Sequence, residues 1–388
     1  MRRRIVILSF VDKMFELKNK LVARLCSLAL IILTSACVDR IDIDTDLSQG
    51  FPIAVEGFIT DQPGPYRVEI SKSFDMESKK SLKAPIAVRK VVISDDHGQS
   101  EELVEISQGV YLTSAAGIRG EIGRAYRLNI QTLDGRVYES IADTLKSSGS
   151  IDRVFHEFKE DKDANGATTY GFDVFFDANA GSASSYYFLW KFKGTFQVDT
   201  NPELHTVSCG EARCPDPRPC SSYAVVNGSL EYVKLCECCS CWTSFFNETP
   251  VVSDDQLVRD GKFTKVKATY VPVTQWTFMY KVHAEVQQFT LSRQAFTFWK
   301  AVQAQKQAVT SLFQPVTGKV QGNFVQLSGE PGPMEGLFYS SAVTSKSIFI
   351  QRTDVPSEGM IPPQDLPYAE NCMSLFPNST TQMPDFWE

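Results

Sequence analysis

Residues 125–142 have the sequence AYRLNIQTLDGRVYESIA, and this stretch decides the fold class. Tyr126, Leu128 and Ile130 alternate with polar residues, which is the period-two pattern of a strand with one buried face. A Leu-Asp-Gly turn then separates this strand from a second alternating run at 136–142. The stretch therefore predicts two short β-strands joined by a tight turn.

Short segments with the same pattern recur through residues 51–145. They lie at 53–60, 66–73, 88–94, 101–106 and 110–114. Turn sequences rich in Gly, Pro and Asp separate them. Seven strands at this spacing predict an immunoglobulin-like β-sandwich over 51–145, and the sequence KSSGS at 146–150 predicts a linker after it.

The remaining residues, 151–388, contain further alternating segments and one helical pattern. Between 292 and 313, apolar residues such as Ala295, Trp299 and Val302 recur at helical spacing, and Ser292 is a suitable N-cap. We expect this aromatic face to pack into a core. About 350 residues exceed what a single core usually organises. We therefore predict an all-β protein of two domains: the sandwich, and a larger β domain over 151–388 with one amphipathic helix.

The first 37 residues are typical of an export signal. Basic side chains precede an apolar run at 25–33, and the small residues TSA come directly before Cys37. A cysteine at this position resembles the lipobox of bacterial lipoproteins, which implies removal of the preceding peptide and a lipid anchor on the Cys37 thiol. Met14 is the expected start, because residues 1–13 fit poorly with a signal. The alternatives are an ordinary signal peptide cut nearby and a membrane anchor. The apolar run is shorter than the ~20 residues that a spanning helix needs, which argues against the anchor.

The chain that remains after such a cleavage is strongly acidic. It keeps 32 of the 39 Lys and Arg residues and 44 of the 46 Asp and Glu residues, a net charge of −12. Nucleic acids and anionic membrane surfaces require a basic face, so this charge argues against both as partners. The acidic segment 38–50 resembles the tag that exports Bacteroidota lipoproteins to the cell surface, with a solvated tether as the alternative. We expect the outer membrane, and its outer face more than its periplasmic face.

Eight cysteines lie beyond the signal, and seven of them fall within 33 residues. They are Cys209, Cys214, Cys220, Cys236, Cys238, Cys239, Cys241 and Cys372. An even number of cysteines in an exported chain predicts disulfides, which would hold an insertion at 205–246 that is too small for a core of its own. The alternative is a metal site, although the spacing differs from the C-x2–4-C pairs of structural zinc sites. Spacing alone leaves the pairing open.

An acidic loop is the candidate for a calcium site. Asp161, Asp163 and Asn165 occupy the first oxygen-ligand positions of an EF-hand loop, with a glycine at the sixth position. Phe172 stands where that loop needs a bidentate glutamate, so a polar hairpin tip is the favoured interpretation. No hydrolase, zinc-protease or nucleotide-binding motif is present in the sequence, and we predict no enzymatic activity and no cofactor.

Several stretches resemble the domain-of-unknown-function 4249 family of Bacteroidota lipoproteins. They are VEGFITDQPGPYRVEIS at 55–71, CSCWTS at 239–244, QFTLSRQAFTFWK at 288–300, three short stretches (GNF, GLFYSSAV and SIFI) between 322 and 350, and a tail with Cys372 and PDFW at 384–387. The resemblance covers the mature chain in order. Members of this family tend to be encoded beside TonB-dependent receptors, which implies an accessory part in nutrient capture.

We therefore predict a non-enzymatic, lipid-anchored binding protein: an accessory of TonB-dependent nutrient uptake, with such a receptor as its partner. Aromatic residues beside the cysteines are the predicted ligand contacts, namely Tyr223, Trp242, Phe245 and Phe246. Local packing around the disulfides is the alternative interpretation of these four side chains. The alternative functions are a structural or adhesive envelope protein, and a metal-capture protein that uses the cysteine cluster.

Overall fold

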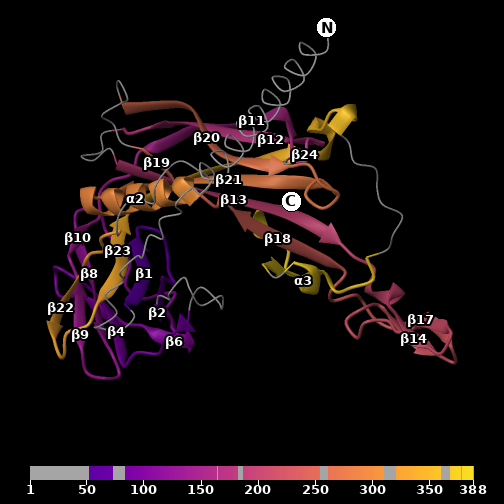
Figure 1. Cartoon of the computed structure of the whole chain (residues 1–388), viewed down its shortest axis with the longest axis horizontal. Coiled ribbons are helices and arrows are strands. Elements are labelled where there is room, and N and C mark those ends of the chain that lie inside the picture. The colour runs from indigo at the N-terminus through magenta and orange to yellow at the C-terminus, as the bar shows by residue number, and fades with distance from the viewer. Residues whose placement is uncertain are drawn as a thin grey trace, which may run out of the picture. The chain divides into compact units, whose positions relative to one another are not determined.

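A computed structural model describes residues 52–72, 84–163, 165–181, 187–253, 261–309, 320–359, 368–376 and 378–387. Most of these residues form β-strands in several sheets, with one long helix (Figure 1). The prediction of an all-β fold with a single long helix is therefore confirmed. The predicted signal, Cys37 and the acidic segment 38–50 lie outside the described residues. No helix within the described ranges combines the length and the apolar character needed to cross a bilayer.

The first region is a sandwich of two sheets. One sheet has the order β23 (Met334–Ser341), β1 (Ile53–Thr60), β2 (Arg67–Lys72), β7 (Val110–Leu112) and β6 (Val104–Ser107), with β3 (Ala84–Pro85) beside β2. The other has the order β22 (Phe324–Ser328), β9 (Val137–Ser140), β8 (Ala125–Gln131), β4 (Lys90–Asp95) and β5 (Ser100–Glu102), with β10 (Asp143–Thr144) beside β8. Tyr126, Leu128 and Ile130 on β8 are fully buried in the sandwich core, as their alternation predicts.

One predicted strand of the sandwich is divided in two. The sequence indicates a single strand at 101–106, whereas the chain forms β5 and β6 in opposite sheets. Leu103 lies between them and is buried, and its amide donates to the carbonyl oxygen of Val91 at 2.9 Å. Burial of this side chain in the core explains why the chain crosses from one sheet to the other here.

Two strands of the sandwich come from far along the sequence. β23 pairs in parallel with β1, with Phe338 opposite Gly57, and β22 pairs antiparallel with β9. Gly57 must be small, because a Cβ there would lie 2.9 Å from a methyl group of Val68. Both strands belong to the second predicted region, so the sandwich draws strands from both regions. The described residues fall within one compact unit, 49–388, and the division into two domains stays a prediction.

The second region packs two further sheets around an aromatic core. One sheet has the order β11 (Ser150–Lys162), β12 (Thr168–Asn179) and β20 (Lys262–Pro272). The other has the order β24 (Val343–Gln351), β21 (Lys281–Leu291), β13 (Tyr187–Asp199), β18 (Ser240–Phe246) and β25 (Ser379–Thr380), with β19 (Val251–Ser253) beside β13. Trp190 of β13 lies at the centre of the core, with its ring 5.1 Å from that of Phe176 and 5.0 Å from that of Phe263. Short 3-10 helices follow β24 and end the described chain: η5 (Arg352–Asp354), η6 (Ser357–Gly359) and η7 (Asp385–Trp387).

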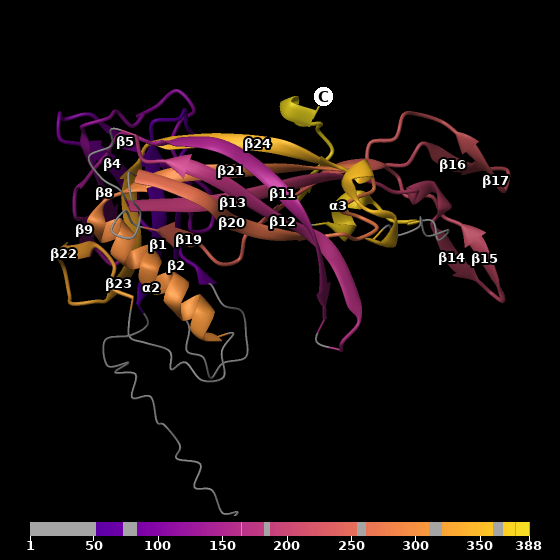
Figure 2. The same cartoon turned by 90° about the horizontal axis from the view of Figure 1, so that it is seen from above.

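The long helix α2 (Arg293–Val309) begins where the sequence predicts. The Ser292 hydroxyl accepts the amide hydrogen bond of Ala295 at 3.2 Å, so Ser292 is the N-cap. The helix packs on β13, β19, β21 and β23 (Figure 2). Ala295 is buried there, while Phe298 and Trp299 remain half-buried. Ala295 therefore packs into a core as predicted, whereas Phe298 and Trp299 are only partly packed against it. The predicted end of the helix at 313 lies outside the described residues.

Candidate functional site

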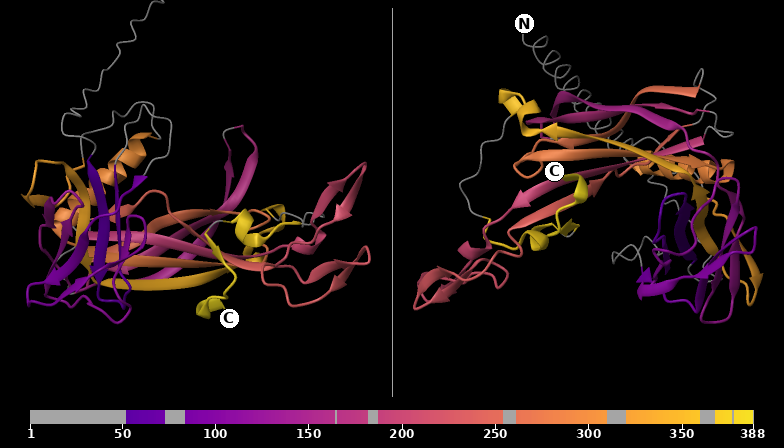
Figure 3. Two further views of the ribbon diagram at one scale, coloured as in Figure 1. Left: turned by 90° about the horizontal axis from the view of Figure 1, so that it is seen from below. Right: turned by 180° about the vertical axis from the view of Figure 1, so that it is seen from behind.

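The cysteine-rich insertion forms an extension of the second region, between β13 and β18. We call residues 200–239 the arm. It contains η2 (Pro202–Leu204), a first hairpin of β14 (Thr206–Cys209) and β15 (Ala212–Pro215), and a second hairpin of β16 (Tyr223–Val226) and β17 (Ser229–Tyr232). Each hairpin is a two-stranded sheet of its own, and both project beyond the ends of β13 and β18 (Figures 2 and 3).

Four disulfides join the eight cysteines of the described chain. They are Cys209–Cys214, Cys220–Cys238, Cys236–Cys239 and Cys241–Cys372. The prediction that these cysteines are disulfide-bonded is confirmed, and the structure supplies the pairing that the sequence leaves open. Three bonds lie within the arm, and the fourth joins β18 to the short helix α3 (Cys372–Leu375). A zinc or copper(I) site needs thiolates, which these paired cysteines do not offer.

The arm has almost no core. Only Thr200, Pro202, Ser221 and Cys238 are buried among residues 200–239, and none of them is a large apolar side chain. A segment of this size cannot bury enough apolar surface to offset the entropy of ordering it. The disulfides constrain the unfolded segment and so reduce that entropy. The conformation of the arm is therefore fixed mainly by covalent bonds.

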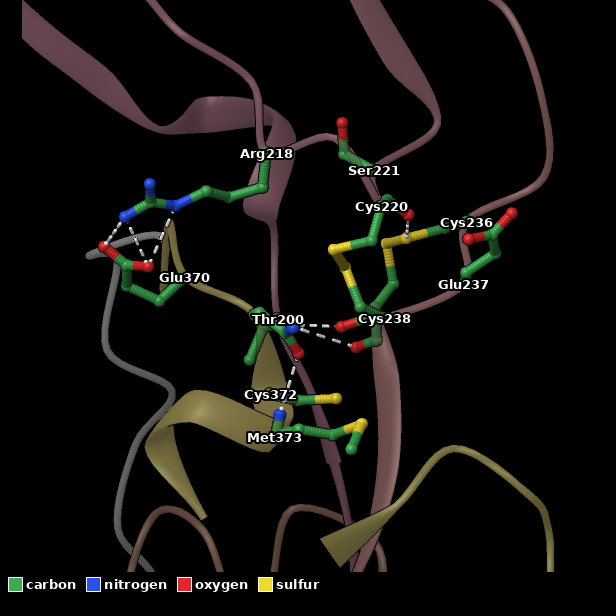
Figure 4. The surroundings of a disulfide bond; sticks show 12 residues. Thr200, Arg218, Cys220, Ser221, Cys236, Glu237, Cys238, Glu370, Cys372 and Met373 are labelled. Carbon is green, nitrogen blue, oxygen red and sulfur yellow. Dashed lines mark hydrogen bonds and ion pairs between the residues drawn. A yellow bond between two sulfur atoms is a disulfide. The ribbon is translucent and has the colours of Figure 1, made fainter. Parts of the chain in front are cut away.

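Polar contacts fix the base of the arm to the C-terminal segment (Figure 4). Arg218 forms a bidentate ion pair with Glu370, with Nη2 2.7 Å from Oε1 and Nε 3.0 Å from Oε2. This pairing with Arg218 lowers the pKa of Glu370 below its ordinary value. His205 Nε2 lies 3.7 Å from the same carboxylate. Within the base itself, the Thr200 amide donates to the carbonyl oxygen of Cys239 at 2.7 Å and joins the two ends of the arm.

Large apolar side chains are exposed along the arm. They are Leu204, Val207, Tyr223, Val225, Val226, Tyr232, Val233 and Leu235. Leu235 is the most exposed of them, at 80 %. Tyr223 and Tyr232 stand opposite each other on the second hairpin, with their rings edge-to-face at 5.8 Å. Exposed apolar side chains that lie together are typical of a surface that contacts another molecule, and Tyr223 and Tyr232 lie together in this way on the second hairpin.

The four predicted aromatic contacts lie in different surroundings. Tyr223 is part of the exposed arm, and Phe246 is 60 % exposed at the end of β18. Phe245 instead packs on the rings of core residues and lies against Gly194. Trp242 contacts the ring of Trp387 edge-to-face at 6.5 Å. Packing thus accounts for Phe245 and Trp242, and the structure brings only Tyr223 into the exposed apolar group of the arm.

Sequence reasoning missed the second hairpin and most of its exposed residues. Its turn is Asn227-Gly228, and both residues have positive φ, +50° and +83°. An Asn-Gly pair between two short alternating runs is a strong hairpin signal, because it suits the type I′ turn that matches strand twist. That signal would have placed Tyr232 opposite Tyr223 from the sequence alone.

The acidic loop at 161–166 forms the tip of the β11–β12 hairpin. Asp161 pairs with Lys159 on its own strand, with Oδ2 2.5 Å from Nζ. The Oδ1 atom of Asp163 accepts the amides of Asn165 and Ala167, each at 2.9 Å, which closes the turn. Within the described ranges, no three His, Cys, Asp or Glu side chains are grouped as a metal site would require. These contacts favour the polar hairpin tip over the calcium loop.

Comparison with known proteins gives one match. The model of the family described as "Domain of unknown function (DUF4249)" matches residues 38–347. The chain shows no significant similarity to a curated protein or to a solved structure.

Proposed function

The chain belongs to the DUF4249 family, and from that premise we propose that it is a non-enzymatic outer-membrane lipoprotein that acts as a binding accessory of a TonB-dependent nutrient uptake system. In this proposal the lipid on Cys37 anchors the protein, preferentially at the outer face of the membrane. The arm contacts the partner, a TonB-dependent outer-membrane receptor.

The observation that carries the proposal is the exposed apolar surface of the arm. Val225, Tyr232 and Leu235 are exposed on a segment that disulfides hold in one conformation. A surface that is already ordered loses little conformational entropy when it binds, so a larger part of the contact energy contributes to affinity. Exposed aromatic and aliphatic side chains on such a surface are suited to a protein partner.

The charge and the N-terminal sequence support the proposed location. The lipobox-like sequence before Cys37 and the acidic segment after it are the features expected of an exported, lipid-anchored chain. Two or three acyl chains suffice for stable anchoring, and no basic surface is needed for it. A net charge of −12 beyond the signal favours a soluble body held at the membrane by lipid alone.

The exposed arm also suits the second function, a structural or adhesive envelope protein, since adhesion uses an apolar contact surface as well. The two functions differ in the partner: a receptor barrel in the first, another surface protein in the second. Metal capture by the cysteine cluster is not proposed, because all eight of its sulfurs are joined in disulfides.

The test is capture of partners from solubilised outer membrane with the lipidated protein as bait. We expect recovery of a TonB-dependent receptor, and its loss with the double variant Tyr232→Ser, Leu235→Ser. The matched control is Val325→Ser with Leu327→Ser, which removes two apolar side chains of β22 that are also exposed, at 50 % and 57 %. Mass spectrometry of the bait should find diacylglycerol on Cys37, and Cys37→Ser should release the protein from the membrane. Recovery of no receptor, or equal recovery with both double variants, would contradict the proposal.

A further inference from the structure

A cavity of about 490 Å³ lies between α2 and the sandwich sheet formed by β1, β2 and β23. Figure 1 shows α2 beside the ends of β1 and β23. The helix contributes Phe298, Trp299 and Val302 to one wall, and the sheet contributes Val55, Leu337 and Tyr339 to the other. This volume falls in the range of ~300–1,000 Å³ that is usual for small-molecule sites, and the walls are mainly apolar.

Two polar atoms in these walls have no hydrogen-bond partner of normal geometry within the described part of the chain. They are the indole nitrogen of Trp299 and the phenol oxygen of Tyr339, and both atoms are buried. The Trp299 N–H still acts on the Tyr339 phenol as a hydrogen-bond donor. Tyr339 as a whole is only 2 % exposed. A buried donor without a partner is costly, so such groups are rare in native proteins and normally satisfied. Ten such atoms occur among the described residues, and these two differ from the others in that both line this cavity, where a ligand atom can reach them.

These two groups lie close to each other. The rings of Trp299 and Tyr339 are 6.4 Å apart and nearly perpendicular. Burial raises the pKa of the Tyr339 phenol far above its ordinary value, with the charges of Glu56 and Asp143 acting in the same direction, and the nearby Trp299 N–H acts in the opposite one. The phenol therefore keeps its proton and, like the indole, can donate a hydrogen bond.

A positive charge lies behind the indole. The ammonium of Lys191 sits over three aromatic rings, 4.9 Å from the centroids of Phe58 and Phe289 and 5.5 Å from that of Trp299. Burial lowers the pKa of Lys191, and the charge of Glu56 acts against this. Glu56 also lines the cavity and its charge acts on both Lys191 and Tyr339, and Glu69, Glu248 and Lys306 line it as well, so the lining as a whole is not cationic. An oxygen acceptor is favoured at this end by the two donors, Trp299 and Tyr339.

We propose that this cavity binds an amphipathic small molecule whose apolar chain lies between α2 and β23, and whose carbonyl or carboxylate oxygen accepts hydrogen bonds from Trp299 and Tyr339. A free fatty acid and an acyl ester share this chemistry. Neither the arm nor a receptor contributes to this cavity. A negative result for the proposed function therefore leaves this proposal unaffected, and the reverse also holds.

The first part of the test is isothermal titration calorimetry of the purified protein with decanoate, methyl decanoate and decylammonium as probes. We expect one site per chain for decanoate or methyl decanoate and weaker binding of decylammonium. Decanoate binding more tightly than methyl decanoate identifies a free carboxylic acid, and the reverse identifies an ester. Val302→Trp places a larger side chain in the cavity and should abolish binding, with thermal unfolding as the check that the variant is folded.

The second part tests the polar end of the site. Tyr339→Phe and Trp299→Phe keep the rings and remove one donor each, so each should weaken binding by about 3- to 10-fold. The control is Tyr138→Phe, which removes a phenol that donates to the Gly332 carbonyl in the sandwich, away from the cavity. It should leave binding unchanged. Three results would overturn the proposal. Decylammonium could bind more tightly than both acyl probes, or no probe could bind at all. The third is that Tyr339→Phe and Trp299→Phe bind the acyl probes as well as the unaltered protein does.

Discussion

The sandwich and the arm hold short β-strands in place by different means. The sandwich contains no cysteine and encloses a continuous apolar core, in which Leu128 and Phe338 are completely buried. The arm buries no large apolar side chain and relies on three internal disulfides, with a fourth at its base. Because covalent bonds fix the arm, its apolar side chains are not needed for folding and remain available for contact. In the sandwich the same residue types are used for stability.

The largest expected effect of a change in the arm concerns the disulfide at its base. Cys241 and Cys372 are 131 residues apart, so their bond removes a large loop entropy from the unfolded chain. We expect the double variant Cys241→Ala, Cys372→Ala to lose about 2–4 kcal/mol of unfolding free energy. Urea unfolding without reductant measures this loss.

The matched control is Cys209→Ala with Cys214→Ala, which opens the short loop between two cysteines only five positions apart, at an exposed hairpin. Its loss should be clearly smaller, because the entropy of closing a loop grows with its length. Equal losses from the two pairs would show that loop closure is not what the base disulfide contributes. The difference between the arm and the sandwich could then not be explained by disulfides that restrict the unfolded chain.

The next effect compares one ion pair in each region. In the sandwich, the buried carboxylate of Asp95 accepts the Gln99 amide at 2.7 Å and lies 2.8 Å from Nη1 of Arg124. At the base of the arm, Arg218 forms its bidentate pair with Glu370 of the C-terminal segment, and both side chains are more than a third exposed. We expect Asp95→Asn to cost about 1–3 kcal/mol, because it leaves buried groups without a charged partner. Glu370→Gln should cost less than about 1 kcal/mol, as exposed pairs do.

The pH dependence of unfolding provides a second measurement of the Asp95 contribution. Burial acts to raise the pKa of Asp95, but the hydrogen bonds from Gln99 and Arg124 outweigh it, so its pKa lies below the ordinary value. The stabilisation is therefore complete above about pH 5, well above the ordinary pKa of Asp, and is lost as the pH falls through the lowered pKa. The gap in stability between the wild type and Asp95→Asn should narrow between pH 5 and pH 2. A gap that widens on acidification would contradict this assignment.

The local sequence pattern was sufficient to predict most strands of the sandwich. It was not sufficient to predict which distant strands pair with each other. The alternation at 125–142 predicts β8 and β9 because each residue's burial there follows from strand geometry alone. The position of β22 and β23 in the sandwich depends on pairing with strands about 190 to 280 residues away. Nothing in the local sequence specifies that pairing. The division at 101–106 was missed for a related reason, since Leu103 is part of an apolar pattern in either arrangement.

The candidate site was predictable in its chemistry and not in its geometry. The cysteine count predicts disulfides, but the pairing of Cys241 with Cys372 requires knowing that α3 returns to β18. Aromatic residues near the cysteines were chosen by sequence distance, which cannot separate the exposed Tyr223 from the packed Phe245. The α2 cavity was not predicted, because Trp299 and Tyr339 meet only through the packing of α2 on β23.

The smallest expected effect is the most direct test of the comparison. Leu235→Ser and Tyr232→Ser remove exposed apolar side chains from the arm, so each should change the unfolding free energy by no more than about 0.5 kcal/mol. Leu128→Ala in the sandwich should cost about 2–5 kcal/mol, because it leaves a cavity in the core. Urea unfolding of the three variants measures both. If Leu235→Ser destabilised the protein as Leu128→Ala does, the apolar residues of the arm would be part of its fold, and their exposure could not be assigned to a binding partner.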